Sequence, residues 1–314
     1  MWVWTQMRIL LALLLLPGTF ALWGQNTAQR LGYPENARLL IIHADDLGVS
    51  HSQNMASIDG LQESPVNSAS IMVPCPWFPE IAAYAREHRN KDLGLHLTLN
   101  SEWKNYKWGP VSSLNEVASL VNNQGYFYSA VDSLLQLGKP EEVETELRSQ
   151  VRKAYDAGID VTHLDAHMGA AVSSPDFLLA YMRLGREFSL PVLLDKRISG
   201  VENEAIKDLL DERTVVLDAI ITAEPSDFTN GMDAYYTNVL KNLKPGLNCL
   251  LIHLAYDDAE MKAVTVDHPE WGAAWRQADY DFFTSRKCIE LLQQQGIILV
   301  TWRELRDKIV RASE

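Results

Sequence analysis

The sequence predicts an α/β protein built as a single (β/α) barrel of the TIM type, with seven or eight strands and long loop insertions. From Ala37 onward, short apolar runs alternate with amphipathic segments of helical length. No Pro/Gly/Ser-rich linker divides the 314 residues, and a barrel of roughly 250 residues fits within them. Several apolar runs end in histidine or carboxylate, as barrel strands do where they open onto an active site. We therefore expect one domain over residues 37–310 rather than two.

The expected strands are apolar runs of strand length. They are Leu39–Ala44, Ala69–Val73, Leu93–Leu99, Ile159–Leu164, Pro191–Leu194, Thr214–Ile221, Leu247–Leu254 and Ile297–Thr301. The helices expected between them are Ser52–Gln62, Glu80–His88, Pro140–Ala157, Pro175–Glu187, Glu202–Glu212, Met232–Leu243 and Asp281–Gln295. Proline in a first turn and glycine after the last turn support the helix at 140–157.

The composition excludes some classes of partner. Hydrophobic residues make up 47% of the chain, and the formal net charge is −13. This charge argues against general binding to nucleic acid or to anionic membranes. Three cysteines, Cys75, Cys249 and Cys288, cannot form a paired disulfide framework. Buried free thiols are expected, with one disulfide as the alternative.

Residues 1–24 have the pattern of a secretory signal peptide. Arg8 precedes an apolar run over residues 9–16, which is too short to span a bilayer comfortably. We expect export to the periplasm or the medium, with residues 25–36 as a linker and no stable membrane partner after cleavage. The cleavage point stays open between Ala21 and Gly24, and an uncleaved membrane anchor is the alternative.

The first strand ends in two carboxylates, Asp45 and Asp46, followed by Gly48. Alternate side chains of a strand point to opposite faces, so both carboxylates can face one site only if the strand breaks there. Gly48 permits such a turn. A helix N-cap or a solvated turn is the alternative for either aspartate.

Two later strands also end in polar groups. His96 lies inside the apolar strand Leu93–Leu99, and the third polar end carries His163, Asp165 and His167 on alternate positions. A single histidine such as His96 is often a hydrogen-bonded core residue. One carboxylate and two histidines from three strand ends would instead form a facial metal-ligand set, with positions left open for water and substrate.

Two long segments rich in aromatic residues, 100–138 and 256–280, are expected as loop insertions beside the site. Exposed rings such as Trp103 and Trp108 would offer a sugar-stacking surface, and packing within their own loop is the alternative. Arg197 follows the expected strand Pro191–Leu194 and is a candidate substrate contact. A surface salt bridge is its alternative role.

Three motifs resemble those of the YdjC-like carbohydrate deacetylases. They are His-Ala-Asp-Asp-Leu-Gly at 43–48, Gly-Leu-His-Leu-Thr at 94–98 and Thr-His-Leu-Asp-Ala-His at 162–167. The tail at 295–301 is also similar, and the resemblance extends from about Arg38 to Leu305. The sequence departs from the family pattern in four places: His43 stands for Asn, Ala166 for Ser, Gly169 for His, and Leu254-Ala255 for Pro-Gly.

The resemblance implies a metal-dependent barrel enzyme that removes N-acetyl groups from amino sugars such as chito-oligosaccharides. It implies Asp46, His96 and His167 as ligands of a divalent cation. Asp165 would orient a ligand histidine from behind. His163 would do the same or point into the barrel. The ligand set suits Mg or Zn, as well as Mn or Co.

The same resemblance implies Asp45 as general base and His253 as general acid. The expected partner is an N-acetylated sugar or oligosaccharide, and the oligomeric state stays open. Two other functions remain possible at this stage: a metallohydrolase that cleaves esters or phosphoesters, and a non-catalytic sugar-binding relative.

Overall fold

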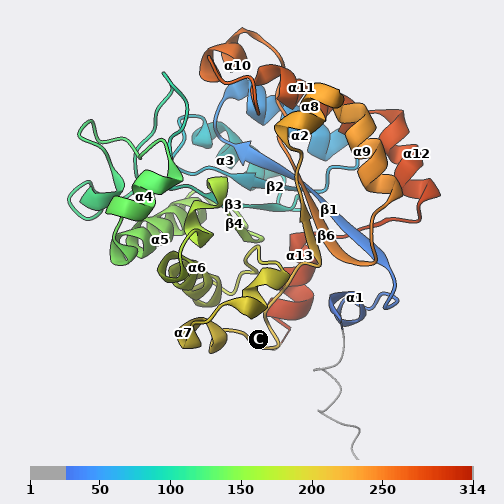
Figure 1. Cartoon of the computed structure of the whole chain (residues 1–314), viewed down its shortest axis with the longest axis horizontal. Coiled ribbons are helices and arrows are strands. Elements are labelled where there is room, and N and C mark those ends of the chain that lie inside the picture. Colours follow the sequence, from blue (N-terminus) through green and yellow to red (C-terminus); the bar gives the residue numbers. More distant parts are fainter. Residues whose placement is uncertain (1–25, 313–314) are drawn as a thin grey trace, which may run out of the picture.

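A computed structural model describes residues 26–312 (Figure 1). The candidate signal peptide, residues 1–24, lies outside this range. Within the range, no helix combines the length and the apolar character needed to cross a membrane. The three cysteines are buried free thiols, as expected.

The centre of the fold is a curled, parallel, seven-stranded sheet with helices packed around it (Figure 1). Its strands are β1 (Arg38–Leu47), β2 (Ser68–Ile71), β3 (Leu93–Leu97), β4 (Leu164–Ala166), β5 (Ala219–Ile221), β6 (Gly246–Ile252) and β7 (Ile298–Leu299). The order is β4-β3-β2-β1-β6-β5, and β7 pairs with the first half of β1 through Leu39 and Leu40. β1 is thus the central strand, and its later half pairs with β2.

The sheet is a curled half-barrel, and the expected complete barrel is not confirmed. The segment predicted as a strand at Pro191–Leu194 forms no ladder. Isolated bridges instead join Leu164 to Val192 and Asp195 to Leu217 on this side. The short helix η4 (Lys196–Gly200) begins directly after Asp195, so the extended segment ends there.

The helices follow the strands on the outside of the sheet (Figure 1). They are α1 (Thr27–Arg30), α2 (His51–Glu63), α3 (Phe78–Glu87), α4 (Val131–Leu137), α5 (Pro140–Asp156), α6 (Pro175–Glu187), α7 (Glu204–Lys207), α8 (Pro225–Asn230), α9 (Met232–Lys241), α10 (Ala259–Val264), α11 (Ala273–Phe283), α12 (Arg286–Gln294) and α13 (Trp302–Leu305), with short helical turns η2 (Ala118–Leu120), η3 (His167–Val172) and η5 (Arg306–Val310). α6 has the predicted bounds, whereas only α7 forms within the predicted Glu202–Glu212. The helix predicted at 281–295 is two helices, because Ser285 accepts a hydrogen bond from the Cys288 amide and caps α12.

β1 is buried on both faces, and its alternation decides which residues enter the barrel. Leu40 and Ile42 belong to the core shared with the outer helices. Leu39 and Ile41 belong to a second core with Trp302. His43 and Asp45 continue the second set, so the strand directs them into the barrel interior.

The segment expected as a linker, residues 25–36, contains helix α1. Its Ala28, together with Leu31, is buried in the same core as Leu39 and Ile41. Asn26 caps this helix by accepting a hydrogen bond from the Gln29 amide. The segment therefore packs against the core at the start of β1.

Candidate active site

Asp45 and Asp46 both enter the site because β1 is irregular at its end. By alternation Asp46 would point away from the interior, but its φ is +70° and the pairing with β2 shifts register between Ala44 and Leu47. Aspartate tolerates this left-handed conformation better than most residues, at a cost of about 1–3 kcal/mol. Gly48 follows with φ +98°. The predicted break is thus a bulge at Asp46 itself, with Gly48 completing the turn.

Asp46, His96 and His167 bring three donor atoms together. Asp46 Oδ1 lies 3.4 Å from His96 Nε2 and 3.4 Å from His167 Nδ1. Donors that share one cation at about 2.0–2.1 Å lie roughly 3.0–3.4 Å from one another. Asp46 Oδ1 is buried and has no hydrogen-bond partner, which is costly for a carboxylate oxygen unless a cation binds it. These three residues therefore fit a divalent metal ion.

Each candidate ligand histidine is oriented by a carboxylate on its other nitrogen. Asp165 Oδ1 lies 2.8 Å from His96 Nδ1, and Glu102 Oε2 lies 2.9 Å from His167 Nε2. Both contacts turn the remaining ring nitrogen toward Asp46. Carboxylates commonly hold metal-binding histidines in this way. Asp165 thus lies where the sequence analysis placed it, behind a candidate ligand histidine.

The second oxygen of Asp46 is bound by a buried arginine. Arg276 Nη2 donates to Asp46 Oδ2 at 2.8 Å, and Arg276 Nη1 donates to Gln53 Oε1 at 2.8 Å. Gln53 in turn donates to the backbone carbonyl of Asp45 at 2.8 Å. Arg276 and Gln53 thereby fix both aspartates at the end of β1, with one Asp46 oxygen left for a cation.

The charges of these groups shift their pKa values in opposite directions. Burial alone would raise the pKa of Asp46, but Arg276 and the nearby His167 outweigh it and hold the pKa well below its usual range. Burial lowers the pKa of His167, but Glu102 and Asp46 outweigh burial and raise it to about 10. A lowered pKa of a carboxyl group and a raised pKa of a histidine together indicate an acidic pocket that favours positive charge.

His43 joins Asp45 to Asp165. Its Nε2 lies 3.0 Å from Asp45 Oδ1 and 2.8 Å from Asp165 Oδ2, and Ser70 Oγ also donates to Asp45 Oδ1 at 3.3 Å. Burial lowers the pKa of His43, but the hydrogen bonds with the two carboxylates outweigh burial and raise it to about 10. His43 is therefore a buried imidazolium that holds both carboxylates in place.

His253 follows β6 and faces the two aspartates. Its Nε2 lies 3.9 Å from Asp45 Oδ2 and 4.0 Å from Asp46 Oδ2. Its backbone N–H donates to Asp279 Oδ2 at 2.9 Å. Burial lowers the pKa of His253 to about 4, with Arg276 acting in the same direction against the two aspartates. The ring is therefore neutral at pH 7.

His163 lies deeper and touches none of the three candidate ligands through a hydrogen bond. Its ring stacks on Trp302 at 5.0 Å and meets His43 edge-on at 4.9 Å. A Cβ at Gly94 would lie 2.3 Å from its Cε1, so only glycine fits beneath the ring. Of the two roles expected for His163, its position matches the one that points into the barrel.

The expectation that Trp103 and Trp108 are exposed is wrong, because both are 3% exposed. Trp108 donates its indole N–H to the Asn100 carbonyl at 2.8 Å and lies 6.4 Å from the His167 ring. Trp103 lies 5.6 Å below the Arg276 guanidinium. Both rings pack their loop against the site, and this burial keeps them from forming an open sugar-stacking surface.

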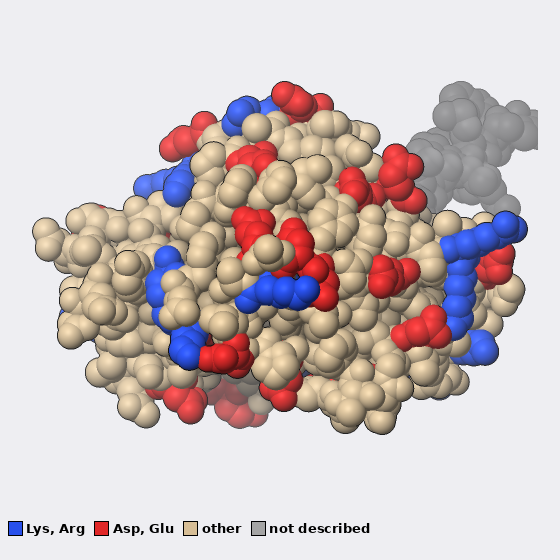
Figure 2. Space-filling model, turned by 90° about the horizontal axis from the view of Figure 1, so that it is seen from above, with Lys and Arg blue, Asp and Glu red and all other residues tan. Residues whose placement is uncertain are grey.

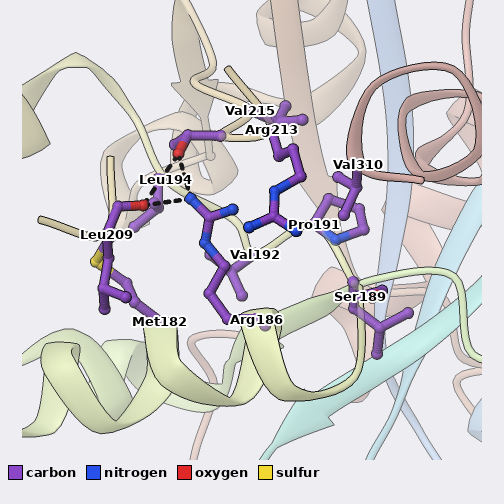
Figure 3. Close-up of a pocket in the computed structure, with 13 residues that line it drawn as sticks. Met182, Arg186, Ser189, Pro191, Val192, Leu194, Leu209, Arg213, Val215 and Val310 are labelled. Atoms are coloured by element: carbon purple, nitrogen blue, oxygen red, sulfur yellow. Dashed lines mark hydrogen bonds between the residues drawn. The ribbon is translucent and has the colours of Figure 1, made fainter. Parts of the chain in front are cut away.

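Arg197 is solvent-exposed and forms an ion pair with Asp195 at 2.7 Å. This is the surface pair considered as the alternative in the sequence analysis. A separate small pocket lies near the end of α6, and Arg186 and Arg213 both reach into it (Figure 3). Arg186 there donates to the Leu209 carbonyl and pairs with Asp211, which also pairs with Arg213. These arginines are thus already paired within the protein.

Sequence reasoning missed Glu102, Gln53, Arg276 and Asp279. Arg276 and Asp279 lie on α11, in a segment treated as an irregular loop. The apolar residues of this segment recur at helical spacing, and Arg276 and Asp279 lie on the same buried side. This pattern could have predicted both the helix and the two buried charged residues. Glu102 follows β3 in the insertion and carries no pattern of its own. Its role depends on the fold.

A sequence profile described as "YdjC-like protein" matches residues 39–294 of the chain. The chain belongs to the YdjC-like family. It is 31% identical to a carbohydrate deacetylase of Thermus thermophilus over 90% of this chain and 98% of that one. A carbohydrate deacetylase of Thermoanaerobacter pseudethanolicus is 23% identical over 86% of this chain and all of its own length.

A solved structure supports the fold of this YdjC-like chain. It is a crystal structure of a candidate cellobiose-phosphate cleavage protein from Enterococcus faecalis V583. It is 22% identical, with a TM-score of 0.70, and the match covers 86% of this chain and 99% of that one. At this identity the likeness concerns the α/β fold alone.

Proposed function

We propose that the chain is a metal-dependent deacetylase that hydrolyses the N-acetyl group of an amino sugar or oligosaccharide. The observation that carries the proposal is the buried, unpartnered oxygen of Asp46 between His96 and His167. Two relatives that match this chain along nearly their whole length are named carbohydrate deacetylases, which supports a sugar amide as the substrate.

Asp46, His96 and His167 would hold the cation. When bound, a divalent cation polarises an amide carbonyl and lowers the pKa of water, so that a hydroxide-like nucleophile exists near neutral pH. The acidic surroundings of the pocket would attract a cation, and a set of three protein ligands would leave coordination positions for water and substrate.

Asp45 would accept the proton of the attacking water. Its Oδ1 is held by His43 and Ser70, which leaves Oδ2 directed toward His253. Because His253 is neutral at rest, it must first gain a proton before it can donate one to the leaving nitrogen. Asp45 Oδ2, at 3.9 Å from His253 Nε2, is the nearest source. The C–N bond then breaks, with acetate and the free amine as products.

The charge of the site favours a neutral amide over a phosphoester. Asp45, Asp46, Asp165 and Glu102 contribute negative charge. The positive groups beside them, His43, His167 and Arg276, are already bound to these carboxylates. Seen from above, the molecule carries acidic groups near the middle of the face, and its Lys and Arg side chains form no continuous basic surface (Figure 2). A phosphate dianion would be repelled unless the bound cation compensated for this charge.

Acetate release by the full chain tests the proposal. The chain is incubated with N-acetylglucosamine, with N,N'-diacetylchitobiose and, separately, with small model esters and phosphoesters, each with and without chelator, and the release of acetate, of the ester acid and of phosphate is measured. Chelator-sensitive acetate release that returns on adding Zn or Mg is the expected result. Bound metal with ester or phosphate hydrolysis alone would assign another hydrolase class. Neither metal binding nor acetate release would leave a sugar-binding role.

A further inference from the structure

We propose that Trp77, His51 and Glu80, the rim platform, hold a second sugar ring of an oligosaccharide substrate. The inference rests on the proposed deacetylase function and specifies its substrate as a chain of at least two sugars. The platform lies at the same end of the sheet as the candidate ligands, in the loops that follow β1 and β2.

Trp77 is unusual among the tryptophans of residues 26–312. It is 37% exposed, whereas Trp103 and Trp108 are 3% exposed and Trp275 and Trp302 are almost fully buried. Tryptophan offers a large apolar ring, and an open ring of this kind is typical of binding surfaces. Trp103 and Trp108, expected to stack on sugars, are buried, whereas Trp77 is open.

The backbone of Trp77 is bound to the turn that follows Asp45 and Asp46. Its N–H donates to the Gly48 carbonyl at 3.0 Å, and Gly48 follows Asp46 by two residues, a chain distance of at most about 7 Å. Asn54 ties the two loops together, because its side chain accepts from the Gly48 amide at 2.6 Å and donates to the Trp77 carbonyl at 3.2 Å. The ring is thus held on a fixed loop.

Polar groups flank the ring as a sugar requires. The His51 ring lies 5.2 Å from the Trp77 ring, tilted by 39°. His51 Nδ1 lies 2.7 Å from Glu80 Oε1, and Asn54 Nδ2 donates to Glu80 Oε2 at 2.8 Å. The side chains of His51 and Glu80 are 51% and 29% exposed. The Trp77 face can therefore support the C–H face of a pyranose, while His51 and Glu80 bind its hydroxyl groups.

The loop that carries Trp77 also borders the candidate metal site. Burial raises the pKa of Cys75 well above its usual value, and the charges of Glu102 and Asp46 raise it further. The charges of both carboxylates thus act on this loop. In the proposed binding mode, the acetamide of one sugar reaches Asp46 and Asp45, and the neighbouring ring lies on the rim platform.

Acetate release by the Trp77→Ala and Trp77→Phe variants of the full chain tests the platform. The substrates are N-acetylglucosamine and its β-1,4-linked trimer, and kcat and KM are measured for each. We expect Trp77→Ala to raise the ratio of the trimer KM to the monomer KM by roughly three- to tenfold, and Trp77→Phe to restore part of it. Tyr155→Ala, a control with a 36% exposed ring on α5, should leave the ratio unchanged.

An unchanged ratio in Trp77→Ala, or an equal KM change for both substrates, would overturn the platform without touching the deacetylase proposal. If the wild-type chain releases no acetate from either substrate, the function fails and the platform is tested by calorimetric binding of the trimer. Weaker trimer binding by Trp77→Ala than by wild type would then support the platform, and equal binding or no binding would overturn it.

Discussion

Among residues 26–312, three groups of buried histidine and aspartate bring donor atoms within 4.8 Å of one another, and two of them share no residue. In the ligand cluster (Asp46, His96, His167), Asp46 Oδ1 lies 3.4 Å from a nitrogen of each histidine ring and has no hydrogen-bond partner. In the inner cluster (His43, His163, Asp165), His43 and Asp165 are already joined at 2.8 Å.

The 3.4 Å between Asp46 Oδ1 and the histidine nitrogens suits donors that share a cation, whereas the 2.8 Å between His43 and Asp165 is the length of a hydrogen bond. A shared proton spans 2.8 Å, and the neighbouring carboxylates stabilise that proton on His43 by raising its pKa to about 10 despite burial. A positively charged His43 would repel a second cation. The inner cluster is therefore closed by its own hydrogen bonds, whereas the ligand cluster leaves Asp46 Oδ1 without one. The pKa of His167 is also raised to about 10, so His167 would release its proton when a cation binds.

Asp46→Asn tests the ligand cluster most strongly. The amide keeps the shape and can still accept from Arg276, but it removes the charge that a cation needs. We expect loss of bound metal and a fall in kcat/KM of roughly 10³-fold or more. Metal content and acetate release measure the two effects. Metal binding at wild-type affinity in this variant would break the comparison.

Asp45→Asn separates metal binding from turnover. Asp45 is not one of the three ligands but faces His253, so we expect near-normal metal content and a fall in kcat of about 10²- to 10⁴-fold. Single-turnover acetate release together with metal analysis tests this. Retained turnover would remove Asp45 as the base.

His43→Asn tests whether the inner cluster is needed only for support. Asparagine cannot carry a charge or bridge Asp45 and Asp165 in the same way. We expect unchanged metal stoichiometry and a roughly 10- to 100-fold loss of activity, as for other residues that act behind a metal site. His163→Gln, which leaves the Asp45–His43–Asp165 contacts intact, is the matched variant and should lose less activity. Loss of the metal in His43→Asn would mean that the two clusters act as one.

Asp279 gives a contrasting case, a buried carboxylate with neither a cation site nor an imidazolium beside it. Burial raises its pKa to about 7, against hydrogen bonds from the His253 amide and Tyr236. Between about pH 4 and pH 7 the folded state then holds one proton more than the unfolded state. The contribution of Asp279 to the free energy of unfolding is therefore constant, at its full value, below about pH 4. It falls by about 1.4 kcal/mol per pH unit as the pH rises from about 4 to 7.

Urea unfolding of wild type and Asp279→Asn from pH 4 to pH 9 measures this loss as the difference between the two curves. Relative to the variant, the wild type should lose stability up to pH 7 and change little above it. The exposed Asp233→Asn serves as the control and should follow the wild type. Parallel curves for wild type and Asp279→Asn would show that the Asp279 carboxyl is ionised at lower pH than its burial implies.

The sequence by itself determined the parallel α/β class, most strand positions and the polar strand ends. Strands buried on both faces are continuous apolar runs, and a histidine or carboxylate at their ends stands out against them. The motifs around Asp46, His96 and His167 were accordingly found from local pattern. The segment at 191–194 carried the same pattern, but a ladder also needs a neighbour over several residues, and there it has single bridges only.

Only the tertiary structure decided which polar groups meet. The sequence required β1 to break for Asp45 and Asp46 to share a site, but the break is a left-handed aspartate, a backbone state that the residue type does not dictate. Arg276 and Glu102 lie far along the chain from the groups they bind, so no spacing rule connects them. The exposure of Trp77 and the burial of Trp103 likewise depend on how the loops pack. The local sequence around an aromatic residue in a loop does not show whether its ring will be buried or exposed.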